Sequence, residues 1–150
     1  MKRQTILVIV IIAVSLLFTE CDRFNDDSDD SSSGYLRVNA WDLTANQKLI
    51  VWVYPDDTTL SAMYGDSMFS RLIAVAKISL NSFGEGAAMV VYPETPEPVP
   101  LSGWYSLFAF IDTNGNNEPT TGESYAIKDV DINGNITIDF DNENFTGTIP

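Results

Sequence analysis

Histidine is absent from this 150-residue chain, and cysteine occurs once, at Cys21. Without histidine, the chain lacks the usual zinc ligand sets and the Ser-His-Asp and Cys-His groups of many hydrolases. A single cysteine also excludes an internal disulfide. Because no catalytic constellation remains, the sequence favours a protein that is not an enzyme.

Positive charge is also scarce. The chain has 8 Lys and Arg against 21 Asp and Glu, which gives a net charge of −13. Binding to nucleic acid or to an anionic surface needs clustered lysine and arginine, because these displace counterions from phosphates. We therefore expect no nucleic-acid partner, and cations are the natural ligands of such a surface.

The one long hydrophobic run lies near the N-terminus, over residues 6–18, and it follows the basic residues Lys2 and Arg3. It is shorter than the roughly 20 residues that a helix needs to span a bilayer. A basic start followed by an apolar run of this length is typical of a secretory signal peptide. We therefore predict a signal peptide over residues 1–20.

Cys21 follows directly, after Leu16-Leu17-Phe18-Thr19-Glu20. This segment resembles the lipobox of bacterial lipoproteins, although lipoboxes usually have Leu where Phe18 stands and a small residue where Glu20 stands. The resemblance implies lipidation of Cys21 and attachment to a bacterial cell envelope, at the outer membrane or cell surface rather than the inner membrane. The alternative is an uncleaved N-terminal anchor in which the cysteine plays no part.

Residues 21–34 are acidic and rich in serine, with five Asp and four Ser. Such a segment has too little apolar surface to fold by burial. We predict a flexible tether between the lipid and the domain. The alternative is that its aspartates form a cluster that binds calcium.

From Tyr35 onward, apolar residues alternate with polar ones over short segments that are separated by turn residues, which is typical of β-strands. In the second segment, for example, Leu49, Val51 and Val53 are expected to face the core. The absence of helix–strand alternation and of internal repeats favours an all-β fold over residues 35–150, an antiparallel β-sandwich of about seven strands, immunoglobulin-like or transthyretin-like. The predicted strands are residues 35–41, 48–54, 72–80, 87–92, 104–111, 125–130 and 136–140.

The connections between these strands also give predictions. Residues 81–86 and the pair Asn133-Gly134 are expected to close two hairpins, between the third and fourth strands and between the last two. Residues 93–100 have Pro at four of eight positions, so we expect a stiff crossover between sheets that stays outside any ladder. Residues 58–70 are expected to form a loop with one helical turn.

A twelve-residue segment that starts at Asp112 carries the clearest chemistry. Oxygen-bearing side chains fall at alternate positions, and a glutamate stands at position twelve; the set is Asp112, Asn114, Asn116, Glu118 and Glu123. Ca²⁺ takes six to eight hard oxygen ligands, and a coiled loop brings alternate side chains to one centre. This spacing predicts a calcium site. The alternative is a polar turn that uses Asn and Gly for their backbone freedom.

The surrounding sequence, FIDTNGNNEPTTGESYA, resembles a loop of bacterial surface β-sandwich modules. These include the B-type repeats of Gram-positive adhesins and uncharacterised lipoproteins with transthyretin-like or carboxypeptidase-regulatory-like folds. The resemblance implies a Ca²⁺-stiffened sandwich that serves display or binding, with a glycan or an envelope protein as partner. Two positions depart from a helix-flanked calcium loop, because Asn117 replaces the usual Gly and Pro119 replaces an aliphatic residue.

The aromatic residues suggest a second site. Trp52, Tyr54 and Tyr35 would form a binding surface if they were exposed together, whereas the alternative is that they belong to the core. Three functions therefore stay open: a non-enzymatic binding or display module, a small glycan-active enzyme that uses Glu118 and Glu123 as acid and base, and a structural subunit of an envelope complex without metal.

Overall fold

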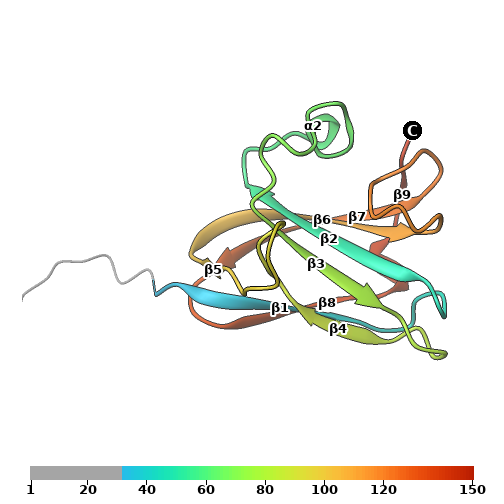
Figure 1. Ribbon diagram of the computed structural model, residues 1–150, viewed down its shortest axis with the longest axis horizontal. Helices are drawn as coiled ribbons and strands as arrows, with labels where there is room; N and C mark the ends of the chain where they lie inside the picture. The colour runs from blue at the N-terminus through green and yellow to red at the C-terminus, as the bar shows by residue number, and fades with distance from the viewer. Residues whose placement is uncertain (1–31) are drawn as a thin grey trace, which may run out of the picture. The chain divides into compact units, whose positions relative to one another are not determined.

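The computed structural model describes residues 32–150, which form two β-sheets packed face to face (Figure 1). The all-β sandwich predicted from the sequence is therefore confirmed. The predicted signal peptide, Cys21 and the tether up to residue 31 lie outside the described residues. None of the helices in residues 32–150 has the length and apolar character needed to cross a membrane.

The smaller sheet is built around β1 (Gly34–Ala40). β8 (Ile136–Phe140) pairs with β1 in parallel, and β4 (Gly86–Met89) pairs with it antiparallel. Because both pair with the same stretch of β1, they occupy opposite edges of that strand. The two-residue β5 (Pro100–Leu101) pairs with the first residues of β1.

The larger sheet has five strands, and every neighbouring pair in it is antiparallel. The spatial order is β3 (Ala74–Ser79), β2 (Lys48–Pro55), β6 (Gly103–Asp112), β7 (Ser124–Ile132) and β9 (Gly147–Thr148). A short 3₁₀ helix, η1 (Asn142–Asn144), precedes β9.

The two sheets enclose an aliphatic core that we call the inner cluster. Leu49, Val51 and Val53 are fully buried in it, as predicted, because side chains on a strand alternate between its faces. β1 contributes Leu36 and Val38 from the opposite sheet. The other members are Ala40, Ala74, Ala76, Ile78, Leu80, Val90, Val99, Leu101, Leu107, Ala109, Ile111, Ala126, Val130, Ile132 and Phe140.

The opposite face of the larger sheet carries a second, aromatic core, the outer cluster. Its buried members are Ile50, Trp52, Tyr54, Met63, Val75, Phe108, Phe110 and Ile149. Residues 56–72, which we call the cover segment, close over it with the short helix α2 (Leu60–Tyr64). The helical turn expected in this region is therefore present, and Figure 1 shows it above the sheet.

Neither predicted hairpin forms, because the strands that flank each turn belong to different sheets. β3 and β4 share no ladder, and an isolated bridge joins Val75 of β3 to Val91, which lies two residues beyond the end of β4. The turn between them is held by Asn81, whose side chain accepts hydrogen bonds from the backbone of Phe83 and Glu85. These bonds are internal to the turn, so they leave the chain free to pass to the second sheet.

The Asn133-Gly134 turn also carries the chain between sheets. Gly134 donates its backbone N–H to the Ser32 carbonyl at 2.8 Å, and Tyr35 donates to the Asn135 side chain at 2.8 Å. The turn therefore bonds to the start of β1 instead of closing on itself. A Cβ on Gly34 would overlap the Gly134 backbone, which is why β1 begins at a glycine, one residue before its predicted start.

The proline-rich connection differs from its prediction in two ways. It joins β4 to β5 within one sheet, and Pro100 takes part in the ladder by pairing with Tyr35. Pro100 is the first residue of a two-residue strand, where the missing N–H of proline costs little. Upstream of it, Val99 donates its N–H to the Val90 carbonyl at 3.2 Å.

Candidate functional site

The predicted calcium loop connects β6 to β7, and Asp112 is the last residue of β6. Three residues of the loop have positive φ: Gly115 at 81°, Asn117 at 61° and Gly122 at 92°. The loop therefore coils tightly instead of running as an extended connection. Asn117 occupies the position where glycine is usual and takes the left-handed conformation that asparagine tolerates.

Asp112 lies at the base of this coil with only 4% of its surface exposed. One carboxylate oxygen accepts the Gly115 N–H at 2.7 Å, and the other accepts the Asn117 N–H at 3.1 Å. Lys48 lies opposite Asp112 in the ladder, but the two form no ion pair within residues 32–150. The carboxylate is thus stabilised by backbone dipoles of its own loop rather than by a cation.

Asn114 and Asn116 converge on one threonine. Both side-chain amides donate to the Thr120 hydroxyl at 3.0 Å. The side-chain oxygens accept the next-but-one backbone N–H, from Asn116 at 2.9 Å and from Glu118 at 2.8 Å. The two asparagines therefore sit side by side within the coil, as the alternating spacing predicts.

Glu123 closes the loop from its other end and is 2% exposed. One oxygen accepts the backbone N–H and the hydroxyl of Thr113, at 2.8 and 3.1 Å. The other accepts the Thr120 N–H at 3.0 Å. Sequence reasoning missed the two threonines, although hydroxyl residues next to carboxylate positions are the kind of signal that could have identified them.

The structure thus brings four of the five predicted ligands into one hydrogen-bonded loop. The exception is the Glu118 side chain, which faces solvent and forms no hydrogen bond within residues 32–150, although the Glu118 backbone is bonded into the loop. Within residues 32–150, no three Asp, Glu, Cys or His side chains lie close enough to hold a metal by themselves. Any cation bound here would therefore rely on amide and backbone oxygens as well as carboxylates, a donor set that suits a hard ion such as Ca²⁺.

The aromatic residues proposed as a binding surface are separated by the fold. Trp52 and Tyr54 are 2% and 0% exposed and belong to the outer cluster, whereas Tyr35 is 44% exposed on β1 of the other sheet. They cannot form one surface, and the core alternative holds for the two buried residues. Glu118 and Glu123 are likewise divided, since one faces solvent and the other is buried under the loop.

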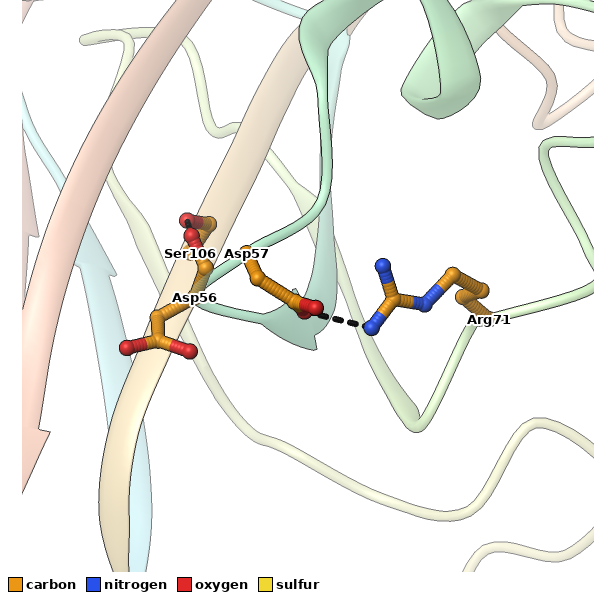
Figure 2. A network of polar contacts seen from close by, with 4 residues as sticks. All are labelled: Asp56, Asp57, Arg71 and Ser106. Carbon is orange, nitrogen blue, oxygen red and sulfur yellow. Dashed lines mark hydrogen bonds and ion pairs between the residues drawn. The ribbon is translucent and has the colours of Figure 1, made fainter.

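A second polar network fixes the ends of the cover segment (Figure 2). Asp57, near its start, forms an ion pair with Arg71, near its end, so the segment is closed at its base. Ser106 on β6 is buried and donates to the Asp129 carboxylate at 2.6 Å, and a longer contact of 3.4 Å reaches the Asp56 carbonyl. The network therefore joins the cover segment to the sheet.

Burial strongly affects one titratable group of the outer cluster. The Tyr54 hydroxyl donates to the carbonyls of Met68 at 2.8 Å and Met63 at 3.3 Å, both in the cover segment. Burial raises the pKa of Tyr54 well above its usual range. Tyr54 therefore remains neutral and keeps its donor at any physiological pH.

Comparisons of the chain with protein-family models, with curated protein sequences and with solved structures give no match.

Proposed function

We propose that the chain is a lipid-anchored module of a bacterial cell envelope, attached through Cys21, and that the β6–β7 loop of its β-sandwich binds Ca²⁺. The domain would act through binding or structural display at the cell surface or in the periplasm, and not through catalysis. The observation that carries the calcium proposal is the burial of Asp112 and Glu123 in a loop that contains no cationic side chain.

Electrostatics gives the reason for a cation in this loop. A buried carboxylate is costly without a compensating charge, and backbone N–H groups compensate it only in part. Each oxygen of Asp112 accepts one hydrogen bond, although a carboxylate oxygen can accept two. Ca²⁺ would use the remaining acceptor capacity and supply the missing positive charge.

Five residues would hold the ion. Asp112, Asn114, Asn116 and Glu123 would contribute side-chain oxygens, and Glu118 a side-chain or backbone oxygen. Because only three of these residues carry a negative charge, we expect affinity in the weak extracellular range, about 10⁻⁴ to 10⁻³ M. Such a site would be filled outside the cell and empty in the cytoplasm.

Glu123 determines how calcium would act on stability. Its carboxylate already ties Thr113 to Thr120, so the loop is closed by its own hydrogen bonds. Calcium would therefore add moderate stability to a folded loop, and would not be required for folding.

Thermal unfolding of the full chain in detergent, followed by tryptophan fluorescence, tests this site. Calcium at ten times its dissociation constant should add about 1.4 kcal/mol, which raises the melting temperature by several degrees. Magnesium at the same concentration should have less effect, because Mg²⁺ requires a more regular oxygen shell. An identical melt in calcium and in chelator would contradict the proposal.

Two variants separate metal binding from loop structure. Glu118→Gln removes a charge whose side chain makes no hydrogen bond within residues 32–150, so the melt in chelator should not change while the calcium response falls. Glu85→Gln, at an exposed glutamate in another loop, is the matched control and should keep the full response. Equal responses from the two variants would remove Glu118 from the site.

The anchor is tested independently by mass spectrometry of the protein isolated from membranes. We expect a mature chain that begins at Cys21 and carries acyl groups on that residue. The Cys21→Ala variant should carry no acyl group and should no longer be recovered with the membranes. Recovery of an unprocessed chain that still contains residues 1–20 would support the uncleaved-anchor alternative instead.

A further inference from the structure

Two adjoining cavities lie between the cover segment and the proline-rich connection. One has a volume of about 610 Å³, and the other, of about 240 Å³, shares Phe69, Leu72 and Pro93 with it. We call the two together the acidic groove. Its remaining lining residues include Tyr92, Glu94 and Glu97 at one end and Lys77 and Glu118 at the other.

The walls of the acidic groove are apolar and partly exposed. Phe69 is 53% exposed and Tyr92 is 43% exposed. The Phe69 ring packs on the buried Trp52 ring with 5.3 Å between the ring centres, so Trp52 supports the face of Phe69 that points toward the sheet. Large apolar groups that line a cavity and remain open to water are typical of a binding surface.

The rim carries three carboxylates, from Glu94, Glu97 and Glu118, and none of them forms an ion pair within residues 32–150. Lys77 is the one cationic residue among the lining residues. Arg71, next to Leu72 in the chain, does not offset this charge, because it is paired with Asp57 at the base of the cover segment (Figure 2). The groove therefore has an excess of negative charge around an apolar floor.

Local hydrogen bonds and proline restrict one wall of the groove, the turn from Tyr92 to Glu97, before any ligand binds. Tyr92 donates its N–H to the Glu97 carbonyl at 3.1 Å, and Thr95 donates to the Tyr92 carbonyl at 3.3 Å. Pro93 and Pro96 restrict the backbone within the same turn. A preorganised wall lowers the entropy cost of binding.

We infer that the acidic groove binds a cationic peptide segment in which Lys or Arg alternates with aromatic or aliphatic residues. The apolar side chains would enter the groove between Phe69 and Tyr92, and the cationic side chains would reach the carboxylates on its rim. An acidic peptide or a phosphate-bearing ligand would be repelled by the same carboxylates. This binding site goes beyond the proposed calcium site and does not require it; Glu118 belongs to both, so bound calcium would reduce the negative charge at one end of the groove.

The test uses the full chain in zwitterionic detergent and a short fluorescein-labelled peptide that alternates lysine with phenylalanine. Fluorescence anisotropy, with detergent alone as the blank, should show saturable binding that weakens as salt concentration rises. The same peptide with glutamate in place of lysine should not bind. Measurements in chelator separate this result from calcium binding, because the peptide should bind without the metal.

Matched variants locate the binding to the groove. The double reversal Glu94→Lys with Glu97→Lys should weaken the lysine peptide by about tenfold or more, because two attractive contacts become repulsive. The control reversal Glu85→Lys with Glu143→Lys places the same charges elsewhere on the surface and should have less than about a threefold effect. Equal weakening by both pairs would show general charge attraction and overturn the proposal.

A second pair of variants tests the apolar walls. Tyr92→Ser should weaken binding, whereas Phe83→Ser, at an aromatic residue that is 77% exposed in the turn after β3, should not. Binding of a neutral cellohexaose or chitohexaose, without binding of the lysine peptide, would also overturn the inference and assign the aromatic walls to a glycan.

Discussion

The two faces of the five-stranded sheet bury side chains in different ways. The inner cluster is mainly aliphatic and closed by a second sheet, whereas the outer cluster is mainly aromatic and closed by the cover segment and by Ile149 near the C-terminus. Strand ladders hold the second sheet together. The cover segment is held by the packing of Met63 in the outer cluster and by the hydrogen bonds of Tyr54, and the exposed Asp57–Arg71 pair adds little. We therefore expect the face under the cover segment to open locally while the face under the second sheet opens only on global unfolding.

Side-chain size explains why the two clusters are not interchangeable. Small aliphatic residues on the inner face allow two sheets to approach at about 10 Å. The outer face carries Trp52, Phe108 and Phe110, whose rings stack on one another in tilted and edge-on arrangements. A short irregular segment can adapt to such a surface more easily than a flat sheet can.

The largest effect should follow from breaking the inner cluster. Phe140→Ala removes a fully buried ring of β8 and should lower the free energy of unfolding by about 3 to 5 kcal/mol, because a cavity remains between the sheets. Denaturant unfolding measures the loss. The exposed Phe83→Ala should change stability by less than about 0.5 kcal/mol, and similar losses from both would contradict the assigned burial.

A smaller loss is expected from the cover. Met63→Ala removes the buried side chain of α2 and should cost about 2 to 3 kcal/mol, near the lower end for such a truncation, because the cover segment can relax. Hydrogen exchange should accelerate in residues 56–72 while the amides of β1 and β8 remain protected. Uniform acceleration across both sheets would show that the two faces open together, which would break the comparison.

The hydroxyl of Tyr54 gives a prediction that depends on pH. Tyr54→Phe should cost about 1 to 2 kcal/mol at neutral pH, because two carbonyls of the cover segment lose their donor. Burial raises the pKa of Tyr54, so the unfolded chain releases this proton first and the wild type loses stability as pH rises above about 10. The phenylalanine variant lacks that loss, so the difference between the two should shrink at alkaline pH. A constant difference would contradict the raised pKa.

The smallest effect concerns the edge of β8 that is not paired with β1. Lys128 on β7 donates to the Asp139 carbonyl of β8 at 2.6 Å, and its ammonium lies 4.8 Å from the centre of the Phe140 ring. Lys128→Met should lower the free energy of unfolding by less than about 1 kcal/mol, because the cation–π contact with Phe140 is lost. It should also increase self-association, because a charged side chain at the edge of β8 prevents pairing with the edge of another chain. Analytical ultracentrifugation measures the association. Arg37→Met is the control, because Arg37 is exposed on β1, which is paired along both edges, and this variant should associate no more than the wild type.

The local part of the fold could be predicted from the sequence. The strand period correctly placed Leu49, Val51 and Val53 together on the face that meets the second sheet, because successive side chains of a strand point to opposite faces. The pairing of strands could not be predicted in the same way. Asn133-Gly134 is a strong hairpin signal, yet Gly134 bonds to Ser32 and the next residue, Asn135, bonds to Tyr35, both about 100 positions away.

The loop at Asp112 shows the same limit on a smaller scale. The spacing predicted a coiled loop, and the loop does coil, with Asn114 and Asn116 bonded to the same threonine, since side-chain spacing in a tight loop is a local property. It did not show that the Glu123 carboxylate accepts hydrogen bonds from Thr113 and Thr120. Those bonds depend on how the two ends of the loop meet in three dimensions. Likewise, Trp52 and Tyr54 could not be separated from a surface role until the cover segment was in place.

The parallel pairing of β8 with β1 has a consequence for the time course of folding. These strands come from opposite ends of residues 32–150, and the contacts between them span 100 positions in the sequence. Closure of such a long loop is entropically slow, and high contact order lowers folding rates. The smaller sheet can close only after β8 is available. During synthesis or export, when the N-terminus emerges first, the domain therefore cannot complete its fold until residues 136–140 have emerged.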